Sequence, residues 1–194
     1  MKRILIPLML FLAALPGLGA ASYYDTGSQI FTITAGVSTP MSYTSHGESM
    51  FWPGSGEGQT HHTVGGIGAL SYQIFVTPYL AIGGELGYQF DFSRSGDVST
   101  NVPITAKLTY VPVQGDFDIP ISLGLGMDYI SYDSYSKISF GLTFEVGFRY
   151  YFTESWGVGI NTGLLVVPEV YFDRAEKNSV MTYIPATISV TYRH

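Results

Sequence analysis

The stretch Leu80–Phe92, LAIGGELGYQFDF, alternates between two kinds of side chain at successive positions. One set of alternate positions is apolar or glycine, whereas the other contains Glu85, Gln89 and Asp91 among small residues. Successive side chains of a β-strand point to opposite faces. The stretch therefore predicts a strand over residues 80–92 with one apolar face and one small or polar face.

The same alternation recurs along the rest of the chain. It is found in residues 31–38, 64–76, 104–110, 121–129, 140–150, 156–166 and 184–193. With residues 80–92, these segments predict eight strands. A tilted strand that crosses a bilayer has about 9–11 residues, and most of the predicted strands approach that length.

The predicted connections alternate between short and long. Residues 77–79, 113–117 and 152–155 form tight turns, and residues 40–63, 93–100, 131–137 and 168–179 form longer, more polar loops. Short turns at one end and long loops at the other are typical of an antiparallel, up-and-down transmembrane β-barrel. An even number of strands places both termini at the short-turn end, which would be periplasmic.

The charges in the strands indicate which face is inside. All seven lie on the polar face: Glu85, Asp91, Lys107, Asp128, Glu145, Arg149 and Arg193. A soluble barrel of the lipocalin type has the same period with its faces reversed. However, a water-facing surface carries more charge than about one residue per strand. A narrow lumen needs mostly small side chains. We therefore expect the polar face to line the lumen and the apolar face to meet lipid.

Aromatic residues gather near the ends of the predicted strands. Those near the short turns are Tyr79, Tyr110, Phe117, Tyr150, Tyr151, Phe152, Trp156 and Tyr192. Those near the long loops are Tyr88, Phe90, Phe92, Tyr129, Tyr132, Phe140 and Tyr183. Rings with a polar edge favour the membrane interfaces, so two aromatic girdles are expected.

The N-terminus has the pattern of a secretory signal peptide. Lys2 and Arg3 precede the apolar run Ile4–Leu15, and Gly19-Ala20-Ala21 supplies small residues for cleavage before Ser22. The apolar run is short for a membrane anchor, which needs about 20 residues. We predict a signal peptide over residues 1–21 and a single barrel domain over residues 22–194.

The composition excludes several other classes of protein. The 194 residues carry a net charge of −6, and only 12% of them are charged. Nucleic-acid binding needs a basic surface, so no nucleic-acid partner is expected. The absence of cysteine excludes disulfides, thiolate chemistry and a lipid anchor on an N-terminal cysteine.

Several segments resemble the small eight-stranded outer-membrane barrels of the OmpA transmembrane domain, OmpX and OmpW type. They are VTPYL at 76–80, IPISLGLG at 119–126, FRYYFTESW at 148–156 and VTYRH at 190–194. The resemblance covers essentially the whole mature chain. It implies an outer-membrane location, contact with outer-membrane lipid, and periplasmic chaperones and the barrel-assembly machinery as partners in biogenesis. Such barrels usually end in an aromatic residue, whereas this chain ends Tyr192-Arg193-His194.

The charged lumen residues form the best candidate site. The strand positions place five of them at similar depth in the middle of the barrel: Glu85, Lys107, Glu145, Arg149 and Asn161. We expect an ion-pair cluster there, because charges removed from water must be paired. Its structural role would be to fill the interior, and the alternative role is a gate that opens when the pairs change partner. Asp91 and Asp128 would make the upper lumen anionic.

The first long loop contains the remaining candidates. Phe51 and Trp52 either fold against the rim or make a contact with a surface ligand. The same loop contains polar residues that could suggest a metal site or a catalytic triad: Ser45, His46, Glu48, Glu57, His61 and His62. They lack the converging geometry that metal ligands or a triad require. No metal, cofactor or catalytic residue is predicted.

The sequence thus predicts a monomeric, non-catalytic outer-membrane barrel with a largely plugged lumen. Its role would be structural, or would involve a host or surface ligand bound through the loops. The first alternative is a narrow OmpW-like channel for small or hydrophobic solutes. A barrel enzyme that modifies lipid and a soluble lipocalin-like binder are the more remote alternatives.

Overall fold

The computed structural model describes residues 23–45, 48–51, 62–93, 96–133, 135–170 and 178–194. The predicted signal peptide and Trp52 lie outside these residues, as do His46, Glu57 and His61. The side chain of Phe51 is not among those described either. No helix within the described ranges is long and apolar enough to cross a membrane.

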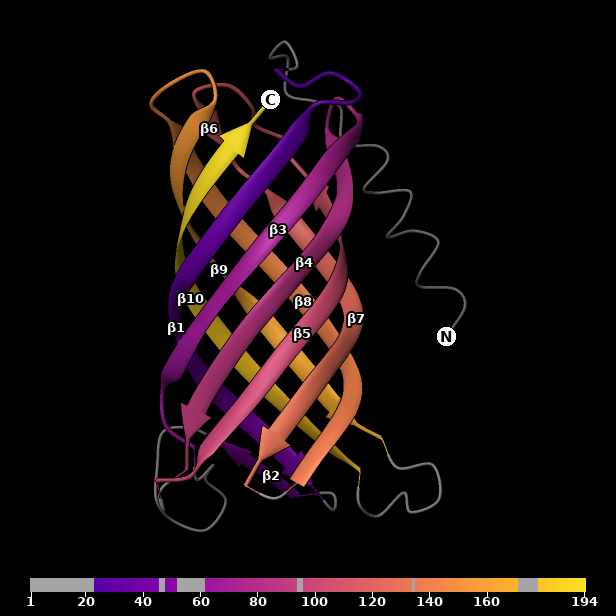
Figure 1. Ribbon diagram of the computed structural model, residues 1–194, viewed down its shortest axis with the longest axis vertical. Coiled ribbons are helices and arrows are strands. Elements are labelled where there is room, and N and C mark those ends of the chain that lie inside the picture. The colour runs from indigo at the N-terminus through magenta and orange to yellow at the C-terminus, as the bar shows by residue number, and fades with distance from the viewer. Residues whose placement is uncertain (1–22, 46–47, 52–61, 94–95, 134, 171–177) are drawn as a thin grey trace.

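Eight long strands form a closed antiparallel barrel (Figure 1). They are β1 (Gln29–Ser45), β3 (Gly65–Thr77), β4 (Leu80–Phe92), β5 (Val98–Tyr110), β7 (Ile121–Tyr132), β8 (Tyr135–Tyr151), β9 (Trp156–Glu169) and β10 (Ser179–Arg193). Each pairs with the next along the chain, and β10 pairs with β1 to close the barrel. The structure confirms the predicted fold class.

Two short strands lie at opposite ends of the barrel. β2 (Glu48–Phe51) pairs with the last residues of β1, and β6 (Phe117–Asp118) pairs with the end of β8. We call the end with β6 and the short connections the turn end, at the top of Figure 1, and the end with β2 the loop end.

The strands extend further at the loop end than the sequence predicted. The expectation of loops from residue 40 and from residue 131 is wrong, because β1 continues to Ser45 and β7 continues to Tyr132. β1 continues past a register shift between Pro40 and Ser42. β7 and β8 remain paired up to a tight turn in which Asp133 has a φ of 51°. Aspartate tolerates this left-handed conformation, so the hairpin can extend beyond the predicted strand.

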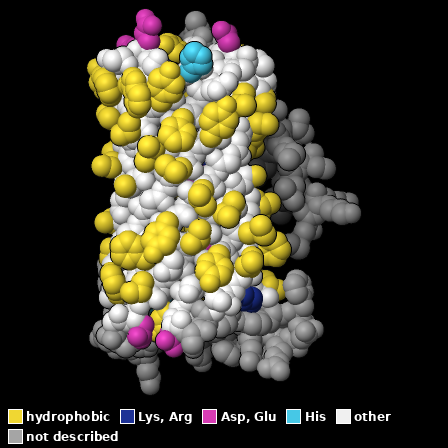
Figure 2. All heavy atoms as spheres, in the orientation of Figure 1, with side chains coloured by type: hydrophobic (Ala, Val, Ile, Leu, Met, Phe, Trp, Pro, Cys, Tyr) yellow, Lys and Arg dark blue, Asp and Glu magenta, His cyan; other side chains and the backbone are white. Residues whose placement is uncertain are grey.

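The two faces of the strands point as predicted. Asp91 is 1% exposed and Asp128 is 0% exposed inside the barrel, whereas Leu125 is 60% exposed on the outer wall. Figure 2 shows apolar side chains over the visible wall and charged side chains near its two ends. The apolar face therefore forms the outside of the barrel, which is the reverse of a lipocalin.

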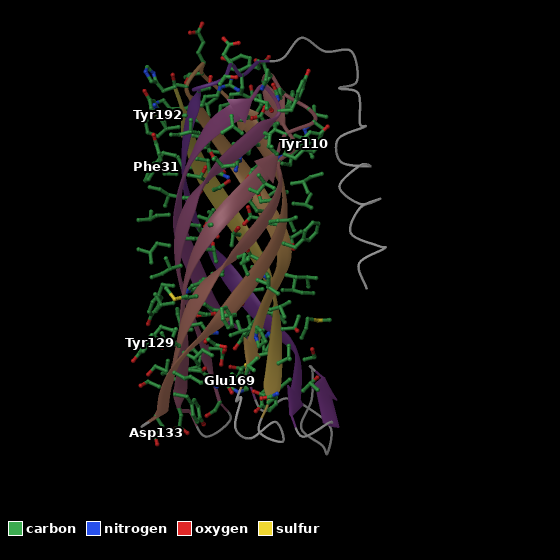
Figure 3. The ribbon with its side chains drawn as sticks, turned by 90° about the vertical axis from the view of Figure 1, so that its right-hand side faces the viewer. Phe31, Tyr110, Tyr129, Asp133, Glu169 and Tyr192 are labelled. Atoms are coloured by element: carbon green, nitrogen blue, oxygen red, sulfur yellow. The ribbon has the colours of Figure 1, made fainter. Side chains whose placement is uncertain are left out.

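Most of the aromatic residues that were expected in girdles lie on the outer wall. Figure 3 shows Tyr110 and Tyr192 towards the turn end and Tyr129 towards the loop end. The expectation is wrong for Tyr151 and Tyr183, which are buried inside the barrel, and for Tyr132, which lines a cavity inside the loop end. All three follow the lumen-facing parity of their strands, so their position near a strand end was misleading.

Glycines allow close approach of neighbouring strands on the lumen side. A Cβ on Gly83 would lie 1.9 Å from the carbonyl oxygen of Tyr72, and one on Gly36 would lie 2.2 Å from that of Ala186. Gly84, the next residue, faces outward, and the nearest atom to its Cβ would be the carbonyl oxygen of Thr105 at 3.7 Å. The curvature of this narrow barrel thus excludes side chains at some inner positions but not at the adjacent outer ones.

We predict that Gly83→Ala destabilises the barrel by about 1–3 kcal/mol, because the new methyl group overlaps the backbone of β3. Gly84→Ala is the matched control and should fold like the wild type. Urea unfolding in lipid vesicles, with the heat-dependent gel shift as a folding assay, measures both. Equal stability of the two variants would contradict this account.

Candidate functional site

The candidate site is the barrel interior, whose side chains form successive layers along the axis. At the turn end, the segment before β1 crosses the opening. The N–H of Tyr23 donates to Oε1 of Gln114 at 2.9 Å, and the N–H of Gly27 donates to the carbonyl of Phe75 at 2.8 Å. The ring of Tyr24 stacks on Phe75 with centroids 4.1 Å apart. Both side chains are buried with Ile30, Ala81 and Val111.

Arg193 joins this turn-end layer from the last residues of β10. Its guanidinium lies 3.7 Å from the ring centroid of Tyr23 and 3.5 Å from that of Tyr151. It also donates from Nη1 to the carbonyl of Gly115 at 2.8 Å and from Nε to the carbonyl of Glu154 at 2.7 Å. Cation–π contacts and charge-assisted hydrogen bonds therefore hold together segments from both ends of the chain.

Tyr24 and Asp118 form a buried hydrogen-bonded pair in the same layer. The Tyr24 hydroxyl donates to the Asp118 carboxylate and lies 3.1 Å from the Tyr151 hydroxyl. Burial raises the pKa of Tyr24 well above its usual value, so this phenol stays protonated as a donor. Burial also raises the pKa of Asp118, although the Tyr24 hydrogen bond and the charge of Arg149 lower it.

A layer of neutral hydrogen bonds follows towards the middle of the barrel. Nε2 of Gln73 donates to Oγ1 of Thr109 at 2.7 Å, and this hydroxyl lies 2.8 Å from Oγ of Ser122. On the other side, the hydroxyls of Thr32 and Thr191 are 3.3 Å apart. All five side chains are buried. Hydrogen bonding between them compensates for their loss of water.

The central layer is an ion-pair triad. Nζ of Lys107 lies 2.5 Å from Oε2 of Glu85 and 3.2 Å from Oε1 of Glu145. Lys107 is only 4% exposed. In register with Lys107 on β7 is Gly124, which lacks a side chain and leaves room for Lys107 to reach Glu145 on β8. The triad therefore combines residues from three strands, and two carboxylates share one ammonium group.

The other two residues expected in this cluster lie outside the triad. Arg149 is buried on β8 closer to the turn end, in register with Asp118, and its Nε and Nη1 atoms have no hydrogen-bond partner among the described residues. Asn161 donates from Nδ2 to Oγ1 of Thr187 at 3.4 Å. The sequence positions had suggested one group of five residues, whereas the ion pairs among the described residues join Glu85, Lys107 and Glu145.

Asp91 and Asp128, expected in the part of the lumen between the central cluster and the long loops, have different surroundings. Asp91 accepts a hydrogen bond from the Tyr183 hydroxyl at 2.9 Å, and its Oδ1 lies 2.6 Å from Nδ1 of His62. Asp128 is fully buried, and no other side chain among the described residues donates a hydrogen bond to its carboxylate. The ranges contain no group of three or more His, Cys, Asp or Glu residues that could hold a metal ion.

From the sequence we did not predict an apolar layer that lies inside the barrel near the loop end. Leu165, Val167 and Tyr183 are buried inside the barrel, with Ile130 and Met181 against them. The available signal was the run LLVV at residues 164–167, which breaks the alternation and is apolar on both faces. Such a run is typical of a strand that is buried on both sides.

A cavity of about 300 Å³ lies beside this apolar layer, and we call it the loop-end vestibule. Its lining residues come from β1, β5, β7, β9 and β10 and from the segment before β3, so it lies across the barrel axis. They are Tyr43, His62, Ser99, Asn101, Ile130, Tyr132, Val167, Glu169, Ser179 and Met181. Figure 3 labels Glu169 at the loop end.

Comparison with solved structures places the fold among small outer-membrane barrels. Neisserial surface protein A (NspA) superposes with a TM-score of 0.61 at 14% sequence identity, over 86% of this chain and 97% of that chain. At this identity the likeness concerns the fold alone. It confirms the predicted resemblance to small eight-stranded outer-membrane barrels.

Sequence comparison places the chain in a protein family and finds relatives in two bacteria. A protein-family model matches residues 19–192, and the chain belongs to the family that this model describes. An uncharacterized protein of Treponema pallidum (strain Nichols) is 34% identical over 97 residues, which are 49% of this chain and 43% of the relative. An uncharacterized protein of Borreliella burgdorferi is 31% identical over 121 residues, 49% of this chain and 55% of the relative. The chain spans about half the length of the curated relatives it matches.

We predict that Lys107→Met destabilises the barrel by about 3 kcal/mol, because it leaves two partly buried carboxylates inside the barrel without their cation. The triple variant Lys107→Met/Glu85→Gln/Glu145→Gln should recover most of this loss, since it removes all three charges. Urea unfolding in lipid vesicles measures both. Lys137→Met, at the loop end, is the matched control, and a triple variant no more stable than Lys107→Met would refute the ion-pair account.

Proposed function

We propose that this protein is a non-catalytic outer-membrane barrel with a closed interior, and that its role lies in the envelope structure or at its loop-end surface. The observation that carries the proposal is the succession of buried layers across the barrel. A solute would have to pass the turn-end layer around Tyr24 and Arg193, which we call the Tyr24–Arg193 layer, then the Lys107 triad and the apolar layer around Tyr183.

The narrow interior supports this reading over a channel. Eight strands enclose a space that side chains can fill, and the three layers are held by different forces. Ion pairing holds the triad, aromatic and cation–π contacts hold the turn end, and apolar packing dominates the loop end. A gate that re-pairs only Lys107 would leave the other two layers in place.

The arrangement of the buried polar groups supports a non-catalytic role. Lys107 is bound to two carboxylates, and Asp91 lies within hydrogen-bond distance of both His62 and Tyr183. Groups that bind one another in this way stabilise the interior rather than present a free nucleophile or base to a substrate.

The outer wall supports an outer-membrane location. The apolar wall and its aromatic residues near both ends match the requirements of a bilayer with two interfaces. In this proposal the turn end is periplasmic and the loop end faces outward. The cleaved signal peptide at residues 1–21, the assembly machinery and chaperones, the monomeric state and a surface ligand at the loops belong to the same proposal.

We predict that the purified, refolded protein gives no discrete conductance steps in a planar bilayer. Glu85→Ala/Glu145→Ala should also be silent, because the layers at both ends remain. The heat-dependent gel shift shows that each sample is folded. Discrete steps from folded wild type would overturn the closed interior, and steps altered by the double variant would identify the Lys107 triad as a gate.

We predict that Ser136→Cys, near the tip of the β7–β8 hairpin, reacts with a membrane-impermeant maleimide on intact cells. Glu154→Cys, in the turn between β8 and β9, should react only after the outer membrane is permeabilised. The native chain has no cysteine, so each variant carries one label site. Labelling of Glu154→Cys alone on intact cells would reverse the proposed orientation.

A further inference from the structure

The loop-end vestibule has the size and composition of a small-molecule site. Its volume of about 300 Å³ is at the lower limit for such sites, which span about 300–1,000 Å³. Ile130, Val167 and Met181 provide its apolar surface. The cavity lies inside the barrel near the loop end.

Three side chains beside this apolar surface determine which kind of ligand the vestibule can bind. Tyr43 and Tyr132 contribute aromatic rings, and Glu169 contributes a carboxylate. Ser179 donates a hydrogen bond to Oε2 of Glu169 at 2.8 Å, which holds the carboxylate at the rim. Tyr132 in turn donates from its hydroxyl to Asp97 at 3.4 Å.

Together these groups favour one chemical class of ligand. Aromatic faces attract a cation that is placed over them, and a carboxylate provides the opposite charge. An apolar surface beside them favours a hydrocarbon body. We propose that the vestibule binds a small organic cation with an apolar body, an alkyl- or arylammonium compound, with Glu169 as its ionic partner.

Among the residues that the structure describes, the other charged groups near the vestibule have partners of their own. Asp91 lies within hydrogen-bond distance of both His62 and Tyr183. Lys137 donates from Nζ to the carbonyl of Val170 at 3.3 Å. Glu169 is therefore the carboxylate that lines the cavity itself, and an ammonium group would approach it rather than the buried Asp91. This inference goes beyond the proposed function and does not depend on a closed interior.

The test is isothermal titration calorimetry of the full chain in dodecyl maltoside, a detergent with an uncharged headgroup. The probe is benzyltrimethylammonium, and 3-phenylpropionate is an anion of similar size. We expect saturable binding of the cation and none of the anion. Glu169→Gln should weaken binding about tenfold, which corresponds to about 1.4 kcal/mol. Ile130→Trp, which fills the apolar surface, should weaken it at least as much.

Glu154→Gln is the matched control, because it removes the same charge from the turn end and should bind as the wild type does. The heat-dependent gel shift confirms that each variant is folded. Lack of cation binding to wild type up to about 10 mM would overturn the proposal. Equal binding of the anion, equal binding by Glu169→Gln, or an equal loss in Glu154→Gln would overturn it as well. Conductance is measured separately, so failure here and failure of the closed interior are distinguishable.

Discussion

The pairing of β1 with β10 is the constraint on which the rest of the structure depends. It runs from Ile30 opposite Arg193 to Ser45 opposite Ser179 and leaves none of the eight barrel strands with an open edge over its main length. In hydrocarbon, backbone N–H and C=O groups must find partners within the protein, so a spanning sheet has to close. Closure with only eight strands then makes the interior narrow, and every inner side chain has to fit that space.

The narrow interior explains the chemistry of the layers. Lys107 on β5 pairs with Glu145 on β8 across β7, where the residue in register with Lys107 is Gly124, and Gly83 allows β3 and β4 to approach closely. Charges in such a space have lost most of their water, and Lys107, Asp91 and Asp118 each have a charged or hydrogen-bonding side chain beside them. Towards the loop end the interior becomes apolar at Leu165, Val167 and Tyr183. The loop-end vestibule beside this layer is lined by both polar and apolar groups.

The sequence predicted the barrel because alternation is a local property that each strand carries independently. It also placed Glu85, Lys107 and Glu145 on one face by their parity, and the low number of charges on that face identified it as the inner one. It could not separate Arg149 and Asn161 from the triad, because depth depends on strand tilt and on register around the closed barrel. It missed the vestibule and the Tyr24–Arg193 layer for a related reason: their residues come from strands far apart in the chain, and Tyr23 and Tyr24 lie outside any strand.

The Tyr24–Arg193 layer links the closure of the barrel wall to the closure of its turn end. Arg193 is contributed by the last strand, whereas its ring contacts come from the first described residues and from β8. The strand β10, which closes the barrel by pairing with β1, thus also supplies the guanidinium group that the aromatic rings of the turn end surround. Closure of the wall and closure of the turn end therefore both require the last strand, because β10 supplies the pairing with β1 and also Arg193.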